Sequence, residues 1–117
     1  MYIDGFLAPI MAGTSADEYR AFAAKAAPIF KEHGATRVVE GWGDDVPHGT
    51  LTDFYRAVAA TEGEAVVFSW IEWPDKETRD AGMKKVMEDP RMPSPTDPMP
   101  FDGKRMIFGG FACLVDA

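Results

Sequence analysis

The chain has 117 residues, enough for one hydrophobic core, so we expect a single domain over residues 1–117. Its 46% hydrophobic content is too high for a disordered chain. Acidic residues outnumber basic ones by 19 to 12, and the resulting net charge of −7 opposes binding to phosphate backbones and anionic membranes. We therefore predict neither a nucleic-acid partner nor a membrane partner.

Two further features bear on the location of the protein. Residues 1–6 have no basic stretch followed by a long apolar run, so we expect no signal peptide and a cytoplasmic location. No apolar run approaches the roughly 20 residues that span a bilayer. The single cysteine, Cys113, has no partner for an internal disulfide, and the apolar run 111–115 predicts that it is buried and unreactive.

The first elements are a strand and a helix. Residues 2–10 are predicted to form a strand, which Pro9 ends or places at a sheet edge. Ser15 and Glu18 have the spacing of a capping box, and Gly34 is placed to end the helix that follows. Between them, apolar residues recur at helical spacing and form one stripe. These residues are Tyr19, Phe22, Ala23, Ala26, Ile29 and Phe30.

The middle of the chain is predicted to be mainly strands. Residues 35–43 have the alternation of a strand, and 44–49 have the composition of a loop. Residues 51–60 and 65–73 are rich in strand-forming types and flank a glycine-containing turn at 61–64. We therefore expect three strands in this part of the chain.

A second helix is predicted over 75–88. Five prolines exclude regular structure over 89–103. The last strand is predicted over 105–115, and Gly109-Gly110 within it predicts either a bend or the close approach of another group.

The strands are apolar on both faces, which predicts a homodimer. In 65–73, large apolar side chains alternate between the faces, with Val66, Phe68 and Trp70 on one and Val67, Ile71 and Trp73 on the other. We expect an α+β fold in which two helices cover one face of an antiparallel sheet. The other face needs a cover, and a second copy of the chain would supply it.

Long stretches of the sequence carry a family resemblance. They cover 26–35, 38–47, 66–76, 87–92 and 99–106. On these stretches the chain resembles the YbaA-like family over almost its whole length. The resemblance implies a ferredoxin-like fold of the dimeric α+β barrel kind, in which two sheets pack face to face. It implies no function, because the family has none assigned and offers no catalytic residues to carry over.

Some members of that family carry a label that links them to the RNA of the signal recognition particle. The present sequence speaks against this role, because it is acidic and has no basic stripe.

Charged residues inside apolar strands are the most informative feature for function. They are Asp4, Glu40, Arg56 and Glu72. A buried charge needs a partner or a shifted pKa. In one interpretation, Glu40 or Glu72 handles a proton in a pocket and Arg56 binds an anionic group. In the other, which we favour, Arg56 pairs with one of these carboxylates across strands, or the charged groups point to solvent.

The candidate ligand pocket, in the cavity of the barrel, combines two tryptophans with three charged residues. They are Glu40, Trp42, Arg56, Trp70 and Glu72. The alternative role for the tryptophans is in the core or the dimer interface. Asp44, Asp45 and His48 lack the spacing of a metal site, so we predict no metal and no cofactor.

Three functions stay open on the sequence alone. The protein is an enzyme that converts a small organic molecule, a binding or stress-response protein that holds such a molecule without converting it, or a structural interaction protein. Fold likeness does not choose between them.

Overall fold

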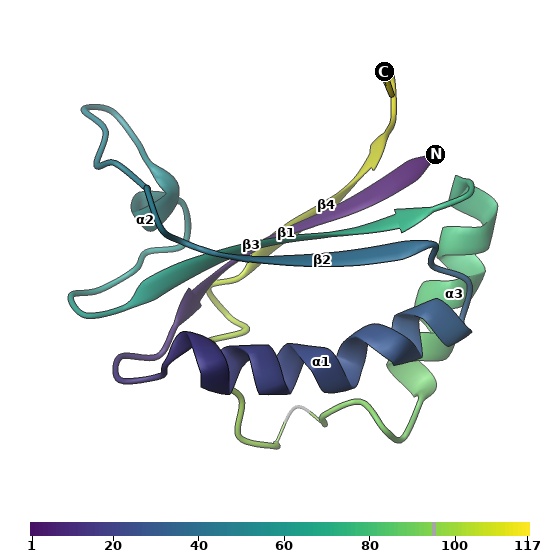
Figure 1. Cartoon of the computed structure of the whole chain (residues 1–117), viewed down its shortest axis with the longest axis horizontal. Helices are drawn as coiled ribbons and strands as arrows, with labels where there is room; N and C mark the ends of the chain where they lie inside the picture. Colours follow the sequence, from purple (N-terminus) through teal and green to yellow (C-terminus); the bar gives the residue numbers. More distant parts are fainter. Residues whose placement is uncertain (95) are drawn as a thin grey trace.

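The computed structural model describes residues 1–94 and 96–117 (Figure 1). Within these residues the elements are β1 (Tyr2–Ile10), α1 (Ala16–Glu32), β2 (Arg37–Trp42), α2 (Phe54–Ala57), β3 (Ala65–Trp73), α3 (Lys76–Glu88) and β4 (Ile107–Ala112). The strands form one antiparallel sheet in the order β2-β3-β1-β4. The predicted α+β class, a ferredoxin-like antiparallel sheet with two long helices on one face, is therefore confirmed.

The main core lies between the sheet and the two long helices. Helices α1 and α3 lie on one side of the sheet, whereas α2 lies on the other (Figure 1). Apolar side chains on alternate positions of the strands pack against α1 and α3. The buried members are Ala8, Ile10, Tyr19, Ala23 and Val67 toward one end of the sheet, and Ala35, Ile71 and Trp73 toward the other.

Helix α1 begins and ends where the sequence indicates. The Ser15 hydroxyl accepts from the Glu18 backbone N–H at 3.1 Å, and the Ser15 N–H donates to the Glu18 carboxylate at 3.3 Å. This reciprocal capping box satisfies two N–H groups at the start of the helix. Gly34 follows the helix with a φ of +113°, a left-handed conformation that favours glycine.

The strand expected over 51–60 is wrong. This segment forms a loop and the single-turn helix α2, whose start is capped by Asp53: its carboxylate accepts from the Arg56 backbone N–H at 2.8 Å. Tyr55 and Val58 are three residues apart, so a helical turn directs both toward the sheet, where they pack. The local cap and this packing outweigh the strand preference of the side chains.

Pro9 lies in a central strand, contrary to expectation. Strand β1 is bordered by β3 and β4 and runs one residue past Pro9. The register of the sheet explains how the proline fits. Strand β4 pairs with β1 only as far as Leu7 opposite Ile107, so in the described register Pro9 has no neighbour on β4 that needs its missing N–H.

The C-terminal strand is shorter than expected, ending at Ala112. Cys113 lies beyond it and is partly exposed, so the prediction of a buried cysteine is wrong. The predicted close approach at the glycine pair is confirmed at Gly110. A Cβ atom there would lie 2.3 Å from the Tyr2 hydroxyl, closer than any side chain tolerates.

The sheet face opposite α1 and α3 is apolar and largely open. The segment around α2 covers one end of it, where Val58 packs with Leu7 and Val66. The rest forms a shallow groove of about 570 Å³ along β1, β3 and β4. Phe68 and Phe111 line this groove and are 49% and 62% exposed. The two-sided apolar pattern expected from the sequence is therefore present in the structure.

None of the helices in the described residues is long and apolar enough to cross a bilayer.

Candidate functional site

A cavity of about 320 Å³ lies between the sheet, α1, α3 and the proline-rich segment that leads back to β4. We call it the inner cavity. Its lining is almost entirely apolar and includes five of the seven methionines of the chain, Met83, Met87, Met92, Met99 and Met106. Methionine side chains are flexible and polarizable, so they adapt to irregular shapes. This concentration is typical of a surface that accommodates a ligand.

A second hollow, of about 380 Å³, adjoins the inner cavity between α1 and β2, and we call it the side groove. Tyr19 and Glu40 line both hollows, as do Ala23, Ala27 and Val38. Glu40 lies on the edge strand β2 and remains exposed on its outer side. The two hollows therefore lie side by side and share these residues, and Glu40 is the exposed one among them.

The polar end of the inner cavity is a hydrogen-bonded pair. The Tyr19 hydroxyl, near the start of α1, donates to Glu40 Oε2 at 2.7 Å. Ser69 of β3 lies directly opposite Glu40 in the sheet register. The ring of Trp42 lies 6.1 Å from the ring of Tyr19 and forms an adjacent wall. The start of α1 and two strand positions thus bring one phenol, one carboxylate and one hydroxyl together.

Burial controls the protonation of this pair. Burial raises the pKa of the Glu40 carboxyl above its ordinary value, and hydrogen bonds from Tyr19 and Ser69 partly oppose the rise. The pKa of Tyr19 is raised well above its ordinary value, first by burial and then by the adjacent Glu40 charge. The phenol therefore keeps its proton and donates a hydrogen bond to Glu40.

Of the five residues expected to share one pocket, Trp42 and Trp70 both line a hollow of about 230 Å³, but Glu40 and Glu72 lie on opposite faces of the sheet. Glu40 and Trp42 lie together on the face that packs against α1. Trp70 and Glu72 lie on the opposite face, where the Trp70 indole N–H donates to Glu72 Oε2 at 2.9 Å. Arg56 lies on α2.

Of the two arrangements expected for Arg56, pairing with a strand carboxylate is wrong, and the structure shows the other, exposure to solvent. Its guanidinium is exposed, donates to the Thr50 carbonyl at 3.1 Å and lies 3.7 Å from Asp53. Among the described residues, no ion pair joins it to Glu40 or Glu72. The cause is the α2 turn, which places Arg56 beyond the other face of the sheet.

Sequence reasoning missed Tyr19 and the methionine cluster as features of the site. Tyr19 was placed in the apolar stripe of the first helix, and it is indeed buried there. Its hydroxyl meets Glu40 across 21 residues, and no local spacing signals that contact. The one available signal is the density of methionine over 83–106, where five of the seven methionines fall.

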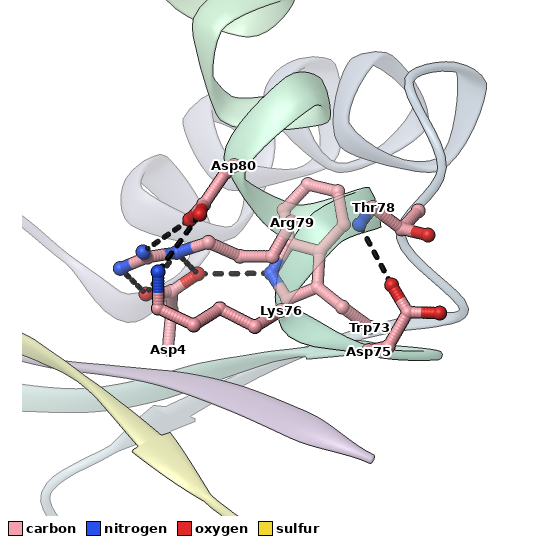
Figure 2. Close-up of polar contacts among 7 residues, drawn as sticks. All are labelled: Asp4, Trp73, Asp75, Lys76, Thr78, Arg79 and Asp80. Carbon is pink, nitrogen blue, oxygen red and sulfur yellow. Dashed lines mark hydrogen bonds and ion pairs between the residues drawn. The ribbon is translucent and has the colours of Figure 1, made fainter.

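Asp4 is a buried charged residue, at 3% exposure, and Figure 2 shows its partners. The Trp73 indole N–H donates to Asp4 Oδ2 at 2.9 Å, and the Arg79 guanidinium donates to both carboxylate oxygens, at 2.7 Å to Oδ1 and 3.0 Å to Oδ2. Arg79 also donates to Asp80 at 3.0 Å and lies 5.0 Å from the centre of the Tyr2 ring. This cluster ties β1, β3 and α3 together.

The loop that holds Asp44, Asp45 and His48 contains no metal centre in the residues that the structure describes. No group of three or more histidine, cysteine, aspartate or glutamate side chains within them lies close enough to hold an ion. His48 stacks on Tyr55 with ring centres 4.5 Å apart, and its Nδ1 lies 3.8 Å from Asp53.

The fold and the inner cavity together define a ferredoxin-like α+β protein with an apolar, methionine-lined pocket beneath its helices. A family model described as a protein of unknown function (DUF1428) matches residues 1–103, and the chain belongs to this family. It is 58% identical over 115 residues to the uncharacterized protein YbaA of Escherichia coli (strain K12), across 98% of this chain and 97% of the relative. The YbaA proteins of Escherichia coli O157:H7 and Shigella flexneri match equally. The resemblance found in the sequence is thereby confirmed, and none of these matches names an activity.

Proposed function

We propose that the protein binds a small apolar organic molecule in the inner cavity. The observation that carries this proposal is a cavity of about 320 Å³ whose apolar, methionine-rich lining has one polar end. Small-molecule sites are typically hollows of about 300–1,000 Å³ with mostly apolar walls and a few placed polar groups. The cavity lies beneath the helices of one chain, so each subunit would carry its own ligand.

Binding of an uncharged fluorescent probe, N-phenyl-1-naphthylamine, tests this proposal. We expect one probe per chain. Ala27 lines both hollows, so Ala27→Phe fills the space between them and should weaken binding by about tenfold or more. The matched control is Ala21→Phe, on the same helix but exposed and away from both hollows. Equal affinity in both variants would show that the probe binds elsewhere.

We also propose that the protein is a homodimer in which two open sheet faces pack together. Monomeric soluble proteins rarely expose contiguous apolar patches larger than a few hundred Å². The groove along β1, β3 and β4 is apolar and carries the exposed rings of Phe68 and Phe111. A second copy matches this surface because antiparallel sheets pack face to face through apolar side chains.

Sedimentation tests the dimer directly. We expect about twice the chain mass of 12.9 kDa at micromolar concentration. Phe68→Glu combined with Phe111→Glu should give a monomer, because it places charges inside the interface. Ala21→Glu, on the helical side of the molecule, should leave the mass unchanged. A folded wild-type monomer would contradict the proposal, as would a dimer that survives the double substitution.

A cytoplasmic location stays part of this proposal, and subcellular fractionation would test it. The absence of nucleic-acid and membrane partners stays a prediction from the net charge of −7.

A further inference from the structure

We infer that the inner cavity selects ligands whose head group donates a hydrogen bond, namely phenols, alcohols and amines, and discriminates against carboxylates. This inference rests on the proposed function of the cavity and names the chemical class of its ligand.

The inner cavity has few polar side chains in its described lining, and they lie at one end. In its described lining, the side chains that carry oxygen or nitrogen are Tyr19, Glu40 and Ser69. They belong to one end, because Tyr19 donates to Glu40 at 2.7 Å and Ser69 faces Glu40 across the ladder. No lysine, arginine or histidine is among these lining residues. The head group of a ligand would therefore meet a carboxylate and no cation.

The hydroxyl groups at this end of the cavity already donate hydrogen bonds to Glu40. Tyr19 has one hydroxyl proton, which it uses in its hydrogen bond to Glu40 Oε2. The carboxylate is an acceptor with about four lone-pair positions, of which the bonds from Tyr19 and Ser69 occupy two. The remaining capacity is for accepting, so a ligand completes the site by bringing a proton of its own. A hydroxyl, phenol or ammonium group does this, and charge assistance strengthens the bond.

A carboxylate head group would meet the opposite conditions. It brings no proton, and it would add a second negative charge beside Glu40 with no cation in the lining to balance it. Arg20 lines only the side groove, where it is exposed and already pairs with Asp17. Burial already raises the pKa of Glu40, so a nearby second anion would face a site that tolerates negative charge poorly.

A series of ligands with one tail and three head groups tests the inference. Octanol, octylamine and octanoate compete against N-phenyl-1-naphthylamine at neutral pH. We expect octanol and octylamine to displace the probe at about tenfold lower concentration than octanoate. Glu40→Gln should reduce this difference to about threefold or less, because an amide both donates and accepts. Tyr19→Phe should keep the preference, because it leaves the carboxylate in place.

The possible failures are distinct. Equal or tighter binding of octanoate to the wild type would overturn the head-group inference and leave the cavity as the binding site. The same holds if Glu40→Gln keeps the full preference. If no ligand displaces the probe and Ala27→Phe leaves probe binding intact, the cavity is not the site, and the inference fails with the proposed function.

Discussion

Asp4 and Glu40 are both carboxylates on the sheet face that packs against the helices, but the protein uses them differently. Both oxygens of Asp4 accept hydrogen bonds from Arg79 or Trp73, and the residue is 3% exposed. Glu40 accepts hydrogen bonds from Tyr19 and Ser69, neither of them charged, and lines the polar end of a cavity. A carboxylate whose oxygens are all bonded can only hold the fold, whereas one with free positions can bind something else.

The largest loss of stability should come from Asp4→Asn, which removes the negative charge that Arg79 pairs with. Breaking a buried ion pair by removing one partner costs about 3–5 kcal/mol, because it leaves the other charge without compensation. Urea unfolding would measure the loss. Asp80→Asn is the control, since Asp80 also pairs with Arg79 but is exposed, and it should cost far less than Asp4→Asn. Equal costs for the two variants would show that the Asp4 cluster does not hold the fold.

The next largest effect concerns the packing beneath the same cluster. Gly82 of α3 lies against Trp73, and a Cβ atom there would lie 2.4 Å from the His33 carbonyl oxygen and 2.5 Å from the Trp73 ring. Gly82→Ala should therefore destabilise the protein by about 1–3 kcal/mol in thermal unfolding, despite the better helix propensity of alanine. Gly103→Ala is the control, with nothing within 4 Å of its added atom. A stabilised Gly82→Ala would mean that α3 shifts freely.

The stability contribution of Glu40, which is bonded to Tyr19, should depend on pH. The folded-state pKa of Glu40 lies above its ordinary value, so its contribution to stability is present below pH 4.5 and is lost as pH rises through the folded pKa. Glutamine does not ionise, so Glu40→Gln does not lose stability as the pH rises through this range. Relative to the wild type, the variant should therefore gain stability between acidic and neutral pH, as denaturant melts at several pH values would show. A relative loss over that range would show that the ionised carboxylate stabilises the fold.

The smallest effect should come from Arg56, which belongs to neither cluster. It is exposed on α2, so Arg56→Met should change the free energy of unfolding by about 0.5 kcal/mol or less. Combined with Glu40→Gln, the effects should add to within about 0.5 kcal/mol, because the residues lie on opposite sides of the sheet. Strong coupling in this double-mutant cycle would restore the ion pair that the sequence favoured.

What the sequence could predict was local or periodic. The capping box of Ser15 and Glu18, the strand over 65–73 and its two apolar faces all follow from spacing alone. The helix over 75–88 is confirmed to within one residue at its start, where Asp75 is the cap. These features depend on neighbours a few residues apart, which the chain displays directly.

The candidate site depended on strand register, which one chain does not display. Glu40 pairs with Ser69 in the sheet, so both side chains lie on the face that packs against the helices. Trp70 and Glu72 lie on the other face. A shift of one residue would exchange the faces. Arg56 failed for a different reason, because the four-residue helix α2 is stabilised by the Asp53 cap and by tertiary packing rather than by its own length.

The place of β1 in the sheet also governs how fast the chain can fold. Strand β1 comes first in the sequence but lies between β3 and β4, so its partners come late. The bond between Asp4 and Trp73 spans 69 residues, and closing so long a loop costs entropy before any contact repays it. Helix α1 can form early from its own caps, whereas the central sheet must wait for distant segments to meet. Folding should therefore take about milliseconds or longer, and until β1 and β3 meet, both apolar strands are open to aggregation.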